Sequence, residues 1–311
     1  MKDSKDRVTD ISTEVGFAGQ VFRNPVTVAS GTFGSGIEYS RFVDLNALGA
    51  LTTKGVSAVP WEGNPTPRVT ETPSGMLNAI GLQNPGIEVF IERDLSFLEE
   101  YDVPVIVNVC GHSIEEYEAV VERLADDDRV AMLEINVSCP NVSKGAIQFG
   151  TDPALLSEVT KRCRAKAKDK PVIMKLTPNV TSIADMARAA EAAGADGLSL
   201  INTITGMKID IYKRRFAIAN KTGGFSGPAI HPVAVRMVYE VTHAVDIPVI
   251  GMGGIASAED AIEMMMAGAT MIAVGMINFT RPDAVTDIIA GIGDFMKKTG
   301  VRDIKEIIGV L

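Results

Sequence analysis

The chain has 311 residues, of which 46% are hydrophobic and 22% charged, a composition that supports a large core and excludes general disorder. Its net charge of −9 argues against a nucleic-acid partner. The three cysteines show no CxxC pairing, which excludes a disulfide framework or an iron–sulfur cluster built from this chain alone. The first residues lack an apolar signal region and no apolar run reaches transmembrane length, so we expect a cytoplasmic protein without a membrane anchor.

The predicted elements begin with Thr9–Asn24, an alternating stretch broken by glycine that we expect to form a hairpin closing the N-terminal mouth of a barrel. Short apolar runs follow, as expected for parallel strands buried on both faces. They are Val26–Gly31, Ala50–Gly55, Pro104–Gly111, Met132–Pro140, Val172–Pro178, Gly197–Thr203, Pro248–Gly254 and Met271–Met276. Amphipathic helices are predicted at Ser113–Asp126, Pro153–Lys168, Ser182–Ala193, Pro232–Ala244, Ala258–Ala267 and Pro282–Thr299, several of them after a capping residue such as Ser113, Asp152 or Ser257.

This succession of strands and helices predicts the fold class. Eight β/α units fit an α/β protein with a single (β/α)₈ TIM barrel better than a Rossmann sheet of about six strands. Two connections, 56–88 and 204–229, are too long for plain loops and predict insertions after strands 2 and 6. Long connections in compact domains are usually functional. Because no linker divides the chain, we predict one domain over residues 1–311.

The carboxyl ends of the predicted strands carry the candidate site, since barrel active sites form there. Lys54 and Lys175 lie within apolar strand patterns, where a charge is costly to bury unless a polar ligand is present. The glycine-rich ends of strands 7 and 8 fit a phosphate cradle made of backbone N–H groups. A phosphate there, with a lysine of strand 5 facing the barrel centre, suggests a phosphorylated planar cofactor such as FMN.

A single turn, Asn136-Val-Ser-Cys139-Pro-Asn141, places a thiol between two carboxamides. The carboxamides suit a polar heterocycle, because each can donate and accept hydrogen bonds. The thiol can act as a nucleophile or transfer a proton. The alternative is a small buried cysteine in a turn, which is common for a lone Cys.

These motifs resemble the class 1 dihydroorotate dehydrogenases, and most closely the catalytic subunit of the NAD-linked class 1B enzymes. The resemblance runs from about Val8 to the C-terminus. It rests on Ala29-Ser-Gly-Thr-Phe-Gly, Thr52-Thr-Lys-Gly, Asn78-Ala-Ile-Gly-Leu-Gln-Asn, Asn136-Val-Ser-Cys-Pro-Asn, Lys175-Leu-Thr-Pro-Asn, Ile201-Asn-Thr, Gly223-Gly-Phe-Ser-Gly-Pro and Gly251-Met-Gly-Gly-Ile.

The resemblance implies the chemistry and the site residues. Dihydroorotate would be oxidised to orotate in pyrimidine biosynthesis, with Cys139 removing the C5 proton and FMN receiving the C6 hydride. The substrate would be held by Lys54, Asn78, Ala79, Ile80, Gly81, Leu82, Asn136, Asn141, Asn202 and Thr203. FMN would contact Ser30, Lys54, Gly55, Asn108, Asn136, Lys175, Ile201, Gly227, Gly253, Gly254, Gly275 and Met276, and no metal is expected.

The same resemblance implies partners. Electrons would pass to an iron–sulfur flavoprotein carrying FAD and a [2Fe–2S] cluster and then to NAD, in an assembly of a homodimer with one partner on each copy. Two related alternatives remain, a fumarate-dependent class 1A enzyme and a dihydropyrimidine dehydrogenase-like enzyme. Asn78-Ala-Ile-Gly-Leu-Gln favours class 1B, because class 1A members tend to have Asn-Ser-Met-Gly-Leu-Pro. A flavin-free phosphosugar isomerase or aldolase barrel and a non-catalytic binding barrel are further alternatives from other classes.

Overall fold

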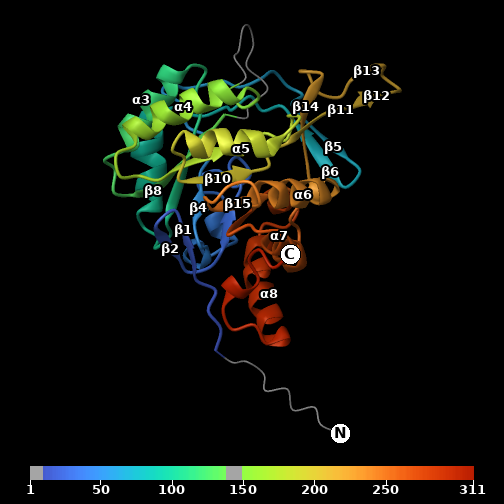
Figure 1. The fold of residues 1–311 in the computed structure, drawn as a ribbon. Helices are drawn as coiled ribbons and strands as arrows, with labels where there is room; N and C mark the ends of the chain where they lie inside the picture. Colours follow the sequence, from blue (N-terminus) through green and yellow to red (C-terminus); the bar gives the residue numbers. More distant parts are fainter. Residues whose placement is uncertain (1–9, 138–148) are drawn as a thin grey trace.

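A computed structural model describes residues 10–137 and 149–311 (Figure 1). Within these ranges a sheet of eight parallel strands has the order β3-β16-β15-β10-β9-β8-β7-β4. The strands are β3 (Val26–Val28), β4 (Leu51–Thr52), β7 (Val105–Val109), β8 (Val130–Asn136), β9 (Val172–Lys175), β10 (Gly197–Leu200), β15 (Val249–Met252) and β16 (Met271–Val274).

The two end strands of this sheet, β3 and β4, meet and close it. The hydroxyls of Thr27 and Thr52 lie 3.1 Å apart, and the Gly49 N–H donates to the Val26 carbonyl at 2.9 Å. A parallel sheet closed in this way, with helices in the connections, is the predicted (β/α)₈ barrel, which is therefore confirmed.

The helices begin where the capping residues predict. Ser113, Asp152 and Ser257 each accept a hydrogen bond from a backbone N–H of the first turn, which satisfies a donor that would otherwise have no partner. The helices are α3 (Ile114–Leu124), α4 (Pro153–Lys166), α5 (Ile183–Ala192), α6 (His231–Thr242), α7 (Ala258–Met266) and α8 (Ala284–Thr299), with short turns η4 (Pro228–Ile230), η5 (Met276–Phe279) and η6 (Ile304–Glu306). No helix in the described part of the chain is long and apolar enough to span a membrane.

The first connections differ from the regular pattern. Strand β3 is followed by two short turns, η1 (Tyr39–Arg41) and η2 (Leu45–Ala47), instead of a full helix. The helix before β7 consists of α1 (Ile87–Val89), the π-helical η3 (Phe90–Leu95) and α2 (Ser96–Leu98). Most predicted strands were also too long, because they included residues of the loops at the mouth, such as Thr177 and Pro178 after β9.

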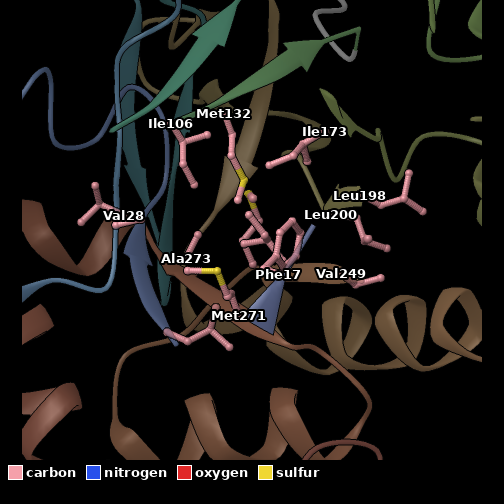
Figure 2. Packing of buried hydrophobic residues seen from close by; sticks show 14 of the residues in the cluster. Phe17, Val28, Ile106, Met132, Ile173, Leu198, Leu200, Val249, Met271 and Ala273 are labelled. Atoms are coloured by element: carbon pink, nitrogen blue, oxygen red, sulfur yellow. The ribbon is translucent and has the colours of Figure 1, made fainter. Parts of the chain in front are cut away.

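The predicted N-terminal hairpin is present as β1 (Val15–Phe17) paired with β2 (Gln20–Phe22). Its Phe17 is 1% exposed, and its ring lies in the barrel interior near Met271, Ala273 and Met132 (Figure 2). Gly197, at the start of β10, leaves room for this ring, because a Cβ there would lie 2.8 Å from it. The hairpin therefore fills the barrel at the amino ends of the strands.

The two long insertions combine into one antiparallel sheet, which the sequence did not predict. Its strands are β5 (Val69–Thr72) and β6 (Gly75–Asn78) from the first insertion, and β11 (Ile204–Met207) and β14 (Thr222–Ser226) from the second, in the order β11-β14-β6-β5. Strands β12 (Ile209–Asp210) and β13 (Arg215–Phe216) form a further hairpin, which extends from this group in Figure 1.

Candidate active site

A buried polar layer crosses the barrel just above its apolar base. It centres on the carboxylate of Glu134 on β8, which accepts hydrogen bonds from Asn108 at 2.5 Å, Lys175 at 3.2 Å and Ser199 at 2.8 Å. These donors come from β7, β9 and β10, and the side chains of Glu134 and Lys175 are 1% and 4% exposed. Asn108 lies opposite Glu134, and Ser199 lies opposite Lys175. Lys175 stands two residues beyond Ile173, the register partner of Glu134, so the period of two along a strand places all four side chains on the inward face.

Lys175 connects this layer to the end of the first barrel strand. Its Nζ donates to Ser30 Oγ at 2.9 Å as well as to Glu134. An ammonium group has three N–H donors. The described residues account for two of them, which leaves one donor for a ligand above the layer.

Three carboxamides continue upward from Glu134 toward the mouth. Asn136 Nδ2 donates to Asn108 Oδ1 at 3.4 Å, and Asn202 Nδ2 donates to Asn136 Oδ1 at 3.5 Å. Asn202 Oδ1 in turn accepts the Thr203 N–H at 2.8 Å. The predicted residues Asn108, Asn136, Asn202 and Thr203 therefore form one connected group.

Lys54 and Gly55 lie on the other side of the mouth, just beyond β4. The Lys54 Nζ is 3.5 Å from where a Cβ on Gly31 would lie. A Cβ on Gly55 would lie 2.9 Å from Asn108 Oδ1 and 3.6 Å from the Leu82 side chain. Gly55 thus allows the two predicted binding segments, around Asn108 and around Leu82, to approach each other.

The ends of β15 and β16 fit an anion. Among the described residues, the backbone N–H groups of Gly253, Gly254, Gly275 and Met276 donate to no protein acceptor. Gly253 and Gly254 have φ of +131° and +72°, a region that favours glycine. Adjacent N–H groups at the start of a short helix, here η5, are the usual barrel phosphate site. Gly227 belongs to the same region, since its own Cβ would lie 2.7 Å from Met276 Cε.

His231 holds the Gly253-Gly254 turn in place through the carbonyl oxygen of Gly253. Its Nδ1 lies 2.9 Å from the Gly253 carbonyl oxygen and its Nε2 lies 3.2 Å from Glu263 Oε2. His231, Glu263 and Asp260 form the one group of three histidine and carboxylate side chains in the described ranges whose ligand atoms all lie within 4.8 Å of one another. Both ring nitrogens of His231 already have protein partners, so the histidine needs no ion to explain its position.

The insertion sheet forms a roof over the mouth. Asn78 of β6 lies opposite Gly224 of β14 and donates to its carbonyl oxygen at 3.5 Å. A Cβ on Gly224 would lie 2.0 Å from Thr203 Oγ1, so glycine is required for Thr203 to reach this position. The predicted residues Asn78 and Thr203, far apart in the sequence, are thereby brought together.

The rest of the predicted pyrimidine segment continues from β6. Ala79 donates to the Arg68 carbonyl oxygen at 2.7 Å, and the Ile80 carbonyl oxygen accepts from the Asn64 N–H at 3.0 Å. Gly81 and Leu82 have φ of +74° and +51°, which turn the chain back toward Gly55. The segment therefore spans the mouth from the β14 side to the β4 side.

Three predicted residues need separate comment. Cys139 and Asn141 lie outside the described residues, so their roles stay predictions. Ile201 directly follows β10, is buried, and donates its N–H to the Met252 carbonyl oxygen. Of the other cysteines, both buried, Cys163 has a thiol whose pKa is raised from 9.0 to about 12, mainly by burial.

Sequence reasoning missed Glu134, Ser199 and His231. Glu134 is the most important of these, because it contacts two predicted site residues. Its signal was present in Met132-Leu-Glu134-Ile-Asn136, where a charged residue shares the inward face with Asn136. The apolar appearance of the whole run concealed it.

Comparisons with known proteins agree with this geometry. The family model described as dihydroorotate dehydrogenase matches residues 12–296. The chain is 62% identical over 299 residues to a protein of Lachnoclostridium phytofermentans named dihydroorotate dehydrogenase B (NAD(+)), catalytic subunit, covering 96% of this chain and 99% of that protein. A protein of the same name from Alkaliphilus metalliredigens is 56% identical over 304 residues, covering 98% and 100%.

A solved structure shows the same fold. The dihydroorotate dehydrogenase of Eimeria tenella, crystallised with ferulenol, superposes with a TM-score of 0.82 at 20% identity and covers 100% of this chain and 90% of its own. At this identity the match supports the barrel fold alone.

Proposed function

The chain belongs to the dihydroorotate dehydrogenase family, and on that basis we propose that it is the catalytic subunit of an NAD-linked enzyme that oxidises (S)-dihydroorotate to orotate in pyrimidine biosynthesis. The observation that carries the proposal is the buried layer of Glu134, Lys175 and Asn108 beneath a row of carboxamides. Family membership decides against a flavin-free isomerase or aldolase barrel and against a barrel without catalytic activity. Residues 1–311 would act as one FMN-binding domain.

The described residues fit FMN at both of its ends. The free N–H groups at Gly253, Gly254, Gly275 and Met276 suit the phosphate. Lys175, held by Glu134 and Ser30, suits the edge of the ring system that becomes negative on reduction. Ser30, Lys54, Gly55, Asn108, Asn136, Ile201 and Gly227 would complete the cofactor site. When bound, FMN supplies the acceptor for the hydride that leaves C6 of dihydroorotate.

The substrate would lie between the carboxamides and the insertion sheet. Asn136, Asn202 and Asn78 offer donors and acceptors for the N–H and C=O groups of the pyrimidine ring. Thr203, Asn141 and the backbone of 79–82 would complete the contacts, and Lys54 would bridge substrate and cofactor. The insertion sheet beside the carboxamides would help to keep water from the reacting atoms.

Cys139 would be the base that takes the proton from C5. A thiol has an ordinary pKa of about 8.5, so the reactive thiolate fraction grows as the pH rises. Removal of the C5 proton and of the C6 hydride leaves the C5–C6 double bond of orotate, which balances the oxidation.

Electrons would leave the protein through a partner. The relatives are named as catalytic subunits of NAD(+)-linked enzymes, yet this sequence has neither a dinucleotide fingerprint nor cluster cysteines. We therefore infer an iron–sulfur flavoprotein partner with FAD and a [2Fe–2S] cluster, bound to each copy of a homodimer. Exposed apolar side chains around the β12–β13 hairpin, among them Ile209, Ile211 and Tyr212, offer surface for one of these contacts.

The test of the activity is anaerobic reduction of the purified protein by dihydroorotate, followed by flavin absorbance and orotate formation. Cys139→Ser should slow reduction by about 10²–10⁴-fold, the scale of general-base catalysis, with unchanged FMN content. Cys163→Ala, a buried cysteine on α4, is the matched control and should reduce at the wild-type rate. A wild-type protein that dihydroorotate does not reduce would contradict the proposed function.

The test of the partner uses the same protein. Alone it should pass electrons to artificial acceptors but barely to NAD, and adding the iron–sulfur flavoprotein of the same organism should restore NAD reduction. Turnover of the isolated chain with NAD, or with fumarate at rates comparable to artificial acceptors, would contradict the partner-dependent assignment.

A further inference from the structure

The proposed reaction assigns no role to Glu134, a charged group buried at the base of the site. Among the described residues, three strands direct donors to Glu134: Asn108 on β7, Lys175 on β9 and Ser199 on β10. We propose that Glu134 is the positioning residue of this site: its carboxylate sets the direction of the carboxamide row and holds and partly neutralises the Lys175 ammonium. This inference rests on the proposed function, because it concerns the same cofactor and substrate.

The direction of the carboxamide row follows from what a carboxylate can do. Ionised Glu only accepts hydrogen bonds, so Asn108 must turn its Nδ2 toward Glu134. Asn108 Oδ1 then faces Asn136 Nδ2, at 3.4 Å. The opposite orientation of Asn108 would place an oxygen against the carboxylate.

The same constraint passes to the next residues. With its Nδ2 directed at Asn108, Asn136 presents Oδ1 to Asn202 Nδ2 at 3.5 Å. Asn202 then presents Oδ1 to the Thr203 N–H at 2.8 Å. At the other end of the row the Thr203 N–H, which can only donate, holds Asn202 in the same sense. Glu134 therefore fixes the row at its base, where Asn108 meets the buried charge.

Its effect on Lys175 is electrostatic. The Nζ and Oε1 atoms are 3.2 Å apart with both side chains almost fully buried, so neither water nor salt screens the pair effectively. Without Glu134, the Lys175 ammonium would strongly favour the anionic reduced form of a flavin bound beside it. Pairing it with Glu134 lowers that preference and keeps the lysine in place.

Stability alone does not account for such a pair. Buried ion pairs are often no better for folding than apolar side chains of the same volume. The residues two positions earlier on the same inward faces, Met132 and Ile173, are apolar, so these strands accommodate apolar packing in the barrel.

Glu134→Gln tests the proposal, because it keeps the shape and removes the charge. The ratio of reduced to oxidised FMN at a fixed potential should rise about tenfold, which for a two-electron couple is about 30 mV in midpoint potential. Orotate, titrated by its perturbation of the oxidised flavin spectrum, should bind about tenfold more weakly, because Gln can donate as well as accept and no longer fixes Asn108.

Two variants separate this role from simple packing. Ser199→Ala removes one donor from Glu134 but keeps its charge, and should leave the midpoint potential unchanged. Glu134→Asp keeps the charge on a shorter side chain, and should keep a potential near the wild-type value while orotate binds at least threefold more weakly. If Glu134→Gln does not yield FMN-loaded protein, Glu134→Asp tests the proposal by the same two measurements. Unchanged orotate affinity in Glu134→Asp would then overturn it.

An unchanged or lower potential in FMN-loaded Glu134→Gln would overturn the proposal, as would unchanged orotate affinity in that variant. A Ser199→Ala protein whose midpoint potential shifts as far as that of Glu134→Gln would also overturn it. Reduction of the wild-type protein by dihydroorotate is measured alongside. If dihydroorotate does not reduce the wild-type protein, the proposed function is refuted. If it does, but the midpoint potential of Glu134→Gln equals that of the wild type, only the role of Glu134 is refuted.

Discussion

The lower and upper layers of the barrel interior are built by the same strands but differ in polarity. On β8 the inward residue changes from Met132 to Glu134, and on β9 from Ile173 to Lys175. One step of two residues is about 7 Å along a strand. Both layers are buried, so burial by itself does not distinguish the part that stabilises the fold from the part that binds.

The two layers respond differently to damage because different forces hold them. The lower layer stabilises the fold because its apolar side chains are removed from water, and this contribution to the free energy of unfolding falls gradually as buried apolar area is lost. The upper layer contains ions whose desolvation costs several kcal/mol each and is offset only by their mutual contacts. Losing one ion there leaves the other buried and unpaired, so that nothing offsets its desolvation cost.

The largest effect is expected from Lys175→Met, which leaves Glu134 buried without its cation. The free energy of unfolding of the FMN-free protein should fall by about 3–5 kcal/mol, and FMN should be lost or have a lower potential. Denaturant unfolding and flavin content measure this.

The double variant Glu134→Leu/Lys175→Met sharpens the comparison, since it makes the upper layer as apolar as the lower. Most of the lost stability should return while dihydroorotate oxidation stays absent. A double variant less stable than Lys175→Met would show that the cost comes from packing and not from the unpaired charge.

The next effect is expected at the base. Phe17→Ala should lower the free energy of unfolding by about 3–5 kcal/mol, because it opens a cavity among well-packed side chains. In contrast to Lys175→Met, the rate of flavin reduction per FMN-loaded molecule should not change. A slower rate in the loaded fraction would mean that the two layers are not separable.

A smaller effect is expected at the roof. Gly224→Ala places a methyl group against Thr203 and should cost about 1–3 kcal/mol in stability, as overpacking does. Orotate affinity should fall with it, as measured by spectral titration. Gly16→Ala in the N-terminal hairpin, where a Cβ would have an ordinary 3.9 Å contact, is the control and should bind orotate normally.

The smallest effect concerns a thiol outside the barrel interior. Because burial raises the pKa of Cys163 to about 12, this thiol should resist alkylation at pH 8 until the protein is unfolded, as peptide mass spectrometry can show. The folded state holds this proton more tightly than the unfolded state. Its contribution to stability is therefore complete below pH ~8.5 and is lost as the pH rises toward 12. Labelling of Cys163 in the native protein at pH 8 would contradict this.

The order of strands and helices could be predicted because it depends on local patterns. Ser113, Asp152 and Ser257 mark helix starts by satisfying nearby N–H groups, and the apolar runs mark doubly buried strands. Residues such as Lys54, Asn108 and Lys175 were found for the same reason, since each interrupts an apolar pattern.

What could not be predicted depends on contacts between distant segments. Nothing local to Asn78 indicates that Gly224 lies opposite, because antiparallel pairing across two insertions leaves no spacing signal in either. Glu134 also interrupts an apolar run, but its importance comes from Ser199, Lys175 and Asn108 on three other strands, which no local pattern places beside it.

The sheet made from both insertions also sets an order of events during synthesis. Asn78 and Gly224 are separated by 146 positions, so β6 leaves the ribosome long before the strand that pairs with it. Until β14 arrives, the open edge of β6 can pair with other chains, as unprotected strand edges do. Pairing over such a distance is slow. A chain interrupted before residue 222 would therefore contain six of the barrel strands together with an unpaired edge, the kind of intermediate that aggregates during folding.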